Sequence, residues 1–228
     1  MHLLVTRKFM TKKQTKLSKI QKMKKTLLIL LFVPLMVSAK FYKAKITFND
    51  GTSKNGFIEL PEYPDDAKIK FKDEENGKTE KYKIDEVSNF EITNDKKEIV
   101  KYITLKLAGQ SLFDRKKIKP SDEKVWAKII QEGKISIYAA YYAYNPGMKT
   151  GGGGTYYIKR QNEDFALYLN EFGGNGLSIC MNCFTDLKKT LKAYFEDICP
   201  KFLEKLNKED LNKKGVTYLV DLYELSCG

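Results

Sequence analysis

The sequence predicts an α+β protein: antiparallel β-rich sheets in a barrel or sandwich-like arrangement, followed by a short C-terminal helical segment. Apolar residues alternate with polar ones from Phe41 to about Leu107, which is the period of half-buried strands. Turn signals such as Asp50-Gly51 interrupt this region at short intervals. After Phe184 the apolar residues recur at helical spacing, so the strands are expected to give way to helices.

Six strands are predicted in the first half of the chain. Tyr42, Ala44 and Ile46 alternate with polar residues in the first of them. The strands are expected near residues 41–48, 55–60, 67–73, 79–84, 88–93 and 98–107. Their outward-facing phase carries lysines, which we interpret as a solvated face that opposes aggregation: Lys54, Lys68, Lys70, Lys81 and Lys83.

Residues 109–122 are polar and contain Pro120, so they are predicted to form a linker or an exposed connection between halves of one sheet system. The chain is accordingly divided into a β-rich region at 40–108, the candidate linker at 109–122, and a β-hairpin region with C-terminal helices at 123–228. Further strands are expected at 125–131, 134–144, 155–160 and 165–170.

The predicted hairpin is rich in tyrosine. Aromatic side chains at this density are able to line a groove for a peptide or a sugar. Tyrosine is also a favoured strand residue, so ordinary sheet packing is the alternative. The candidate binding surface consists of Tyr138, Tyr142, Tyr144 and Tyr156.

Helices are predicted in the last part of the chain. The first is expected behind a cap at Thr185 or Asp186. Pro200 either ends this helix or restarts it as a first-turn residue. A last helix is expected after Gly215, and Cys227 continues its apolar stripe.

The formal net charge of +12 is concentrated at the front of the chain. Nine cations and no acidic residue precede Lys40, and the remaining chain holds 32 basic and 29 acidic residues. So small a surplus gives little support to binding of a polyanion, and no nucleic-acid partner is predicted.

The stretch that begins at Met23, MKKTLLILLFVPLMVSA, has the pattern of a secretory signal peptide. Cleavage is predicted between Ala39 and Lys40, which leaves no transmembrane anchor and a periplasmic or extracellular protein; an uncleaved anchor is the alternative. Residues 1–22 are then an upstream extension, so the true start is Met23, or Met1 with a long basic leader.

Chemistry that needs an imidazole is excluded from the predicted mature chain, because the only histidine is His2. Catalytic triads, Cys-His pairs and histidine-containing zinc or copper sites all require that ring. The chain contains no P-loop, nucleophile elbow or dinucleotide fingerprint. We therefore predict no cofactor, no metal and no catalytic residue.

All four cysteines lie in the last 49 residues: Cys180, Cys183, Cys199 and Cys227. Disulfides are expected after export into an oxidising compartment. Cys199 and Cys227 each continue the apolar face of a helix, which favours their pairing and a stabilisation of about 3 kcal/mol. Cys180 and Cys183 then form a local structural disulfide, with thiol exchange or a four-cysteine zinc site as alternatives.

The order of features is similar to that of one group of proteins. After the signal peptide and the strand-rich segment come EGKISIY at 132–138, YYIK at 156–159, YFEDICP at 194–200 and the terminal Cys227. In these features the chain resembles uncharacterised exported proteins of the Bacteroidota. The resemblance implies the periplasm or the cell surface of a Gram-negative cell and no particular activity.

We therefore predict a non-enzymatic exported domain of the cell envelope with a binding or structural role, whose partner is a protein, a peptide or a glycan. The first alternative is a thiol-disulfide oxidoreductase-like activity at Cys180 and Cys183. The second is a hydrolase that uses carboxylates such as Glu163, Asp164 and Glu171.

Overall fold

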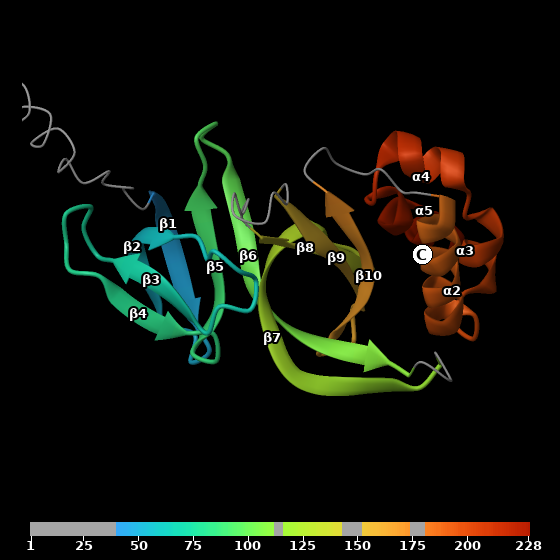
Figure 1. Cartoon of the computed structure of the whole chain (residues 1–228), viewed down its shortest axis with the longest axis horizontal. Coiled ribbons are helices and arrows are strands. Elements are labelled where there is room, and N and C mark those ends of the chain that lie inside the picture. The colour runs from blue at the N-terminus through green and yellow to red at the C-terminus, as the bar shows by residue number, and fades with distance from the viewer. Residues whose placement is uncertain (1–39, 112–115, 143–151, 174–180) are drawn as a thin grey trace, which may run out of the picture. The chain divides into compact units, whose positions relative to one another are not determined.

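The computed structural model describes residues 40–111, 116–142, 152–173 and 181–228. These residues belong to one compact unit, Lys40–Gly228, whose strands and helices are labelled in Figure 1. Lys40 is exposed at the start of this unit. The predicted signal peptide, including Ala39, lies outside the described residues.

Ten strands form one mixed sheet in the order β10-β9-β8-β7-β6-β5-β1-β2-β3-β4. Neighbours in this order are antiparallel, and one additional pairing, between β10 and β6, is parallel. The strands are β1 (Phe41–Phe48), β2 (Ser53–Glu59), β3 (Lys68–Lys72), β4 (Glu80–Lys83), β5 (Val87–Thr93), β6 (Ile99–Gln110), β7 (Ile118–Gln131), β8 (Ile135–Tyr142), β9 (Gly153–Arg160) and β10 (Ala166–Gly173). With the helices that follow them, they confirm the predicted α+β class.

The alternating apolar and polar residues of the sequence lie on opposite faces of the sheet. In β1, Ala44 and Ile46 are buried, whereas Lys43 and Lys45 are exposed. The predicted turn after β1 has Gly51 at φ 84°, a left-handed conformation that favours glycine. Local sequence is therefore sufficient to define this first hairpin.

The first five strands surround a core of their own. Trp126 joins this core from the distant strand β7, and its ring centroid lies 5.8 Å from that of Phe90. The connection between β2 and β3 lies against Trp126, because Pro64 and Asp66 offer backbone carbonyls to its backbone N–H and indole N–H, each at 2.8 Å. The buried members are Ala44, Ile46, Ile58, Ile69, Phe71, Val87, Phe90, Ile92 and Trp126.

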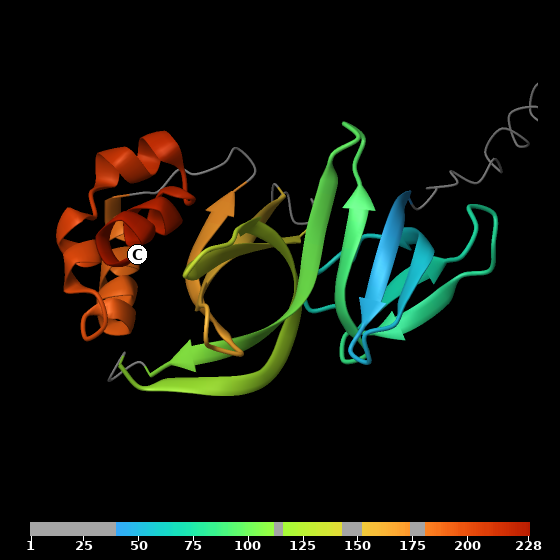
Figure 2. The same cartoon turned by 180° about the vertical axis from the view of Figure 1, so that it is seen from behind.

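The second half of the sheet closes on itself. Strands β6 to β10 pair in succession, and β10 then pairs with β6, with Leu167 opposite Ala108. Figures 1 and 2 show this ring of five strands from opposite sides. Small and medium apolar side chains from β6, β7, β8 and β10 form its core together with the larger Tyr138: Leu105, Val125, Ala127, Tyr138, Ala140 and Ala166.

Strands β6 and β7 extend into residues 109–122. Gly109 pairs with Lys119, and Gln110 pairs with Ile118. Pro120 is accommodated next to a register shift in β6, where its missing N–H removes one ladder bond from an already irregular position. The described part of this segment is thus paired sheet within the unit Lys40–Gly228.

Four described helices follow β10: α2 (Met181–Phe195), α3 (Pro200–Lys205), α4 (Lys208–Lys214) and α5 (Tyr218–Cys227). Helix α2 packs on β10 and α5 packs on β8, and Figure 1 draws the four helices together beside β10. The helices and the sheet share a core that includes Leu191, Phe195, Phe202 and Leu219, all with 0% exposure.

The helix boundaries correct one prediction and confirm another. Helix α2 begins at Met181, so neither Thr185 nor Asp186 is its cap, because a cap needs non-helical backbone before the first turn. Pro200 begins α3, a position where its missing N–H costs no helical hydrogen bond. The separate helix α4 was not predicted; it starts where the Asn207 side chain accepts from the Asp210 N–H at 2.8 Å.

Candidate functional site

The predicted tyrosine surface is divided between the two faces of the β8–β9 hairpin. Tyr138 is 5% exposed in the core of the ring, whereas Tyr156 is 9% exposed in the core shared with the helices. The register explains this division: Tyr138 lies opposite Tyr157, and the next residue along a strand points to the other face. Tyr142 is partly exposed, and Tyr144 lies outside the described residues. Tyr138 and Tyr156 therefore share no common surface.

The disulfide predicted between Cys199 and Cys227 is present in the structure, with Cα atoms 6.1 Å apart. Cys199 is 2% exposed within the core between sheet and helices, and Cys227 packs against that core. Cys180 and the side chain of Cys183 lie outside the described residues. The disulfide, redox and zinc hypotheses for this pair stay predictions.

Among the three carboxylates considered for hydrolysis, Glu163 is tied into a cluster with two partners. Arg160 donates to one carboxylate oxygen of Glu163, and the Tyr194 hydroxyl donates to the other. The Arg160 guanidinium also lies 4.1 Å from the centroid of the Tyr194 ring. Burial raises the pKa of the Tyr194 phenol, which keeps it protonated as a donor. Asp164 and Glu171 are exposed. The cluster joins the β9–β10 turn to α2, so we assign Glu163 a structural role.

Replacing Glu163 with glutamine should lower the free energy of unfolding by about 1–2 kcal/mol, because charge-assisted hydrogen bonds to a largely buried carboxylate are lost. The side chain of Glu163 is 14% exposed. Urea denaturation of E163Q measures the loss, and D164N at the exposed neighbouring carboxylate is the matched control. Equal stabilities of the two variants would contradict the structural role.

A pocket of about 450 Å³ lies where strands β6 and β10 stop pairing, and helix α2 completes its wall. The parallel pairing of β6 and β10 covers only two residues of each strand. The register also shifts in β6 between Lys106 and Ala108, and in β10 between Tyr168 and Asn170. Such irregularities bend a strand and leave backbone groups outside the ladder. The pocket is thus a consequence of how the ring closes.

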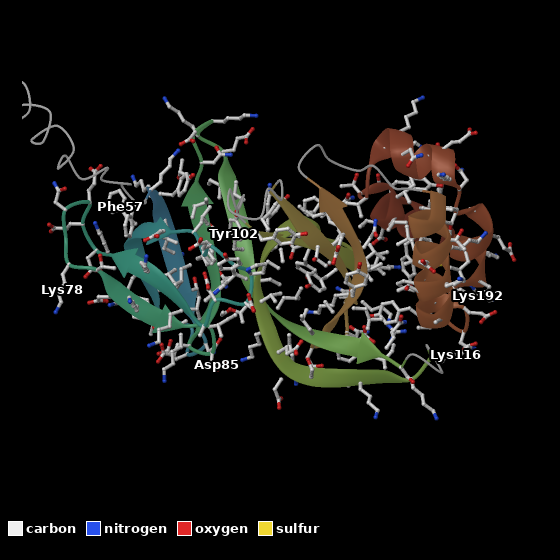
Figure 3. The ribbon with its side chains drawn as sticks, viewed as in Figure 1. Phe57, Lys78, Asp85, Tyr102, Lys116 and Lys192 are labelled. Atoms are coloured by element: carbon white, nitrogen blue, oxygen red, sulfur yellow. A yellow bond between two sulfur atoms is a disulfide. The ribbon has the colours of Figure 1, made fainter. Side chains whose placement is uncertain are left out.

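The end of the β6–β7 hairpin reaches the helices on one side of the pocket region. Lys116 lies 3.3 Å from Asp197 and 3.5 Å from Glu196, measured from its Nζ to a carboxylate oxygen of each. Figure 3 shows Lys116 at this hairpin end, near the helix that carries Lys192. These exposed ion pairs bring the hairpin that carries Gln110 to the helical segment.

The pocket combines an apolar floor with polar side chains. Its buried apolar residues are Ala108, Leu167, Leu169 and Leu187. Its polar side chains come from Gln110, Ser111, Tyr168, Asn170, Asp186 and Thr190. No lysine or arginine occurs among these described lining residues. The carboxylate of Asp186 accepts from Lys189 at 3.3 Å, so its charge is balanced locally.

Gln110 gives the pocket an unsatisfied donor. Its Nε2 is buried and has no hydrogen-bond partner within the described part of the chain. A buried polar group without a partner costs about 1–3 kcal/mol, so native proteins rarely keep one without a reason. Nearby, burial raises the pKa of Tyr168, which keeps its phenol protonated at neutral pH. The pocket therefore offers neutral donors and acceptors above an apolar floor.

Comparisons with protein families, with curated proteins and with solved structures found no match. In the described ranges, no group of three or more His, Cys, Asp or Glu side chains is arranged to hold a metal ion. No helix of the described residues combines the length and the apolar character needed to cross a membrane. The function is therefore inferred from the pocket and the surfaces of the protein itself.

The polar residues of this pocket were not predicted from the sequence. Gln110 lies in the segment predicted as a linker, and Asn170 is the last residue of a predicted strand. Thr190 lies on α2 between Leu187 and Leu191, which are both buried. The signal that could have indicated the pocket is Thr190, a polar residue at a helix position whose spacing favours an apolar one. Thr190 is 6% exposed. Three separate elements have to meet before these residues form one site.

Proposed function

We propose that the protein is an exported, non-enzymatic binding protein that holds a neutral saccharide in the pocket between β6, β10 and α2. The observation that carries this proposal is the buried Nε2 of Gln110, which has no partner within the described residues. Hydroxyl groups of a sugar accept hydrogen bonds and would supply the missing partner.

The lining of the pocket favours a neutral ligand rich in hydroxyl groups. The amides of Gln110 and Asn170 both donate and accept hydrogen bonds, as sugar hydroxyls do. Buried Leu167 and Leu169 offer an apolar floor for the C–H face of a sugar ring. An anionic ligand would find no cation among the described lining residues. A cationic ligand would find Asp186 already paired with Lys189.

The predicted location supports the same ligand class. A protein released by cleavage before Lys40 would reside in the periplasm or outside the cell, where envelope glycans are present. The pocket volume of about 450 Å³ also lies in the range of small-molecule sites. A glycan of the envelope was one of the partners predicted from the sequence, beside a protein or a peptide.

Replacing Gln110 or Asn170 with alanine should weaken saccharide binding by about 5- to 30-fold each, because one or two hydrogen bonds are lost per variant. Isothermal titration of the unit Lys40–Gly228 with a panel of neutral mono- to trisaccharides measures the affinities. Q161A and N162A remove the same side chains from exposed positions in the β9–β10 turn and should bind as the unchanged protein does.

The panel also distinguishes the proposal from its alternatives. If no saccharide binds, or if Q110A and Q161A bind one equally well, the pocket is not a saccharide site. Binding of short peptides that depends on Gln110 would replace the saccharide with a peptide. Reduction of insulin by the protein would favour the oxidoreductase alternative at Cys180 and Cys183.

A further inference from the structure

The outward faces of strands β1 to β4, continued by Glu91 of β5 and Lys101 of β6, form a surface that we call the lysine face. Alternation along the strands places eight lysines and two glutamates on it. Lys72 is half-buried, and the other seven lysines are exposed. The lysines are Lys43, Lys45, Lys68, Lys70, Lys72, Lys81, Lys83 and Lys101, and the glutamates are Glu59 and Glu91. Figure 3 labels Phe57, which lies in the same face between Lys43 and Lys72 in the register.

The lysine face corrects one detail of the sequence analysis. Lys54 was assigned to the outward phase, but it lies opposite Ile46, a core residue with 0% exposure. Its Nζ contacts Tyr82 at 2.7 Å and Glu80 at 3.4 Å on the other side of the sheet. The other four lysines named there do lie on the lysine face.

The arrangement of these lysines works against the stability of the sheet. Lys68 lies directly opposite Lys83, and Lys70 lies directly opposite Lys81. Like charges in directly opposed positions are destabilising. Glu59 pairs with Lys70 at 2.9 Å and Glu91 with Lys101 at 3.2 Å. Within the described residues the remaining lysines of the face form no ion pair, so its positive charge is mostly uncompensated.

Protection of a sheet edge does not account for this face. Strand β4 is an edge strand, so Lys81 and Lys83 fit that role. Strands β1 and β3 each have a neighbour on both sides, yet β1 carries Lys43 and Lys45 outward and β3 carries Lys68. Lysines on central strands oppose no edge-to-edge pairing, so edge protection explains only Lys81 and Lys83.

Acidic and basic residues of the first four strands and their turns occupy different places. Acidic residues gather in the turns between strands, for example Asp65, Asp66 and the run 73–75, while the strands present lysine. The small net charge of residues 40–228 is a sum over that whole segment, so it does not reveal this local excess of cations. A partner that contacts only the sheet face meets six more cations than anions.

An exposed apolar side chain lies at the edge of the lysine face. Ile99 is 67% exposed and lies opposite Thr93 at the start of β6. Together with Lys43 and Lys45 it lines a shallow hollow of about 450 Å³. A large apolar group beside lysines is typical of proteins that rest on a membrane surface, where lysine stems and apolar side chains reach the headgroup boundary.

We propose that the lysine face binds the surface of an anionic phospholipid membrane. The lysines lie on β4, β3, β1 and β6, so they are spread over the face in two dimensions, which complements a surface of charged headgroups. A single nucleic-acid strand is instead bound along a groove with free aromatic rings. Here the Phe41 ring is covered by the Lys72 Nζ, 4.2 Å from its centroid, and Phe57 is only partly exposed. This membrane contact is independent of the saccharide pocket.

Co-sedimentation of the unit Lys40–Gly228 with vesicles tests this proposal, because that unit lacks the basic N-terminal segment. Vesicles of equal parts phosphatidylglycerol and phosphatidylcholine should bind the protein at low salt, and vesicles of phosphatidylcholine alone should not. Physiological salt should weaken the binding. The triple variant K68Q/K81Q/K83Q should lower the partition coefficient about a hundredfold, at about fivefold for each lysine removed.

A matched triple variant, K201Q/K205Q/K213Q, removes the same charge from exposed positions of α3 and α4. It should retain binding within about threefold, because these lysines lie outside the face. I99S, which keeps every charge, should weaken the binding that persists at physiological salt. Circular dichroism verifies that each variant is folded.

Three results would overturn the proposal. The first is absence of binding to the anionic vesicles at low salt, and the second is an equal loss in the two triple variants. The third is competition: a single-stranded oligonucleotide that displaces the protein from vesicles at equal phosphate concentration would assign the face to a linear polyanion.

Discussion

Replacement of Trp126 with alanine should lower the free energy of unfolding by about 3–5 kcal/mol, the range for truncating a large buried aromatic residue. Trp126 is 2% exposed and is the only tryptophan of the chain. It extends from β7 into the core of the first five strands and donates its indole N–H to the carbonyl of Asp66. The substitution removes both the packing and the partner of a buried carbonyl.

Denaturation by urea, followed by far-ultraviolet circular dichroism, measures this loss without depending on the tryptophan signal. W126F keeps most of the ring and loses the indole hydrogen bond, so it should cost about 1–2 kcal/mol. Tyr63 precedes the contacted segment and is 44% exposed. Y63A should change stability by less than about 0.5 kcal/mol. A W126A variant as stable as Y63A would show that Trp126 does not hold the two halves of the sheet together.

Replacement of both Cys199 and Cys227 with serine should lower the free energy of unfolding by about 3 kcal/mol, because the unfolded chain regains the freedom of a loop of 28 residues. The loop contains α3, α4 and nearly all of α5. Hydrogen exchange should therefore accelerate first in these helices, while amides of β1 to β5 keep their protection.

Reduction provides the control for this prediction. In dithiothreitol, the unchanged protein should show the same rates of amide hydrogen exchange in α3, α4 and α5 as the C199S/C227S variant. Those helices in the double variant should respond little to the reductant, since their crosslink is already absent. Uniform acceleration across strands and helices would contradict a local crosslink and would indicate that the whole unit unfolds as one.

The ten described strands lie where the alternation of apolar and polar residues predicted them, with differences of a few residues at most ends except in β6 and β7. These two strands are longer because residues 108–110 pair with residues 118–120. Their sequence is polar and contains Pro120, so local propensity favours a loop. Pairing at long range overrides that preference, which is the usual way in which tertiary context corrects a local prediction.

The pocket between β6, β10 and α2 shows why the candidate site was harder to predict than the fold. Gln110, Asn170 and Thr190 are ordinary residues of a strand end, a second strand and a helix when each is considered alone. They line one pocket because β10 returns to pair with β6 for two residues and then separates from it. No local pattern encodes that separation. Of the tyrosines that the local pattern did favour, Tyr138 and Tyr156 lie on two different buried faces.

Periodicity and turn chemistry were enough to predict the class of the fold and the order of the strands, because these depend on residues a few positions apart. The pairing of Cys199 with Cys227 was predicted from the helix face that each cysteine continues, although 28 positions separate the two. The closure of the ring, the position of Trp126 in a distant core and the gathering of lysines from several strands depend on register between segments far apart in the chain. Register is selected by the packing of whole faces against one another, so it emerges only when the sheet is complete.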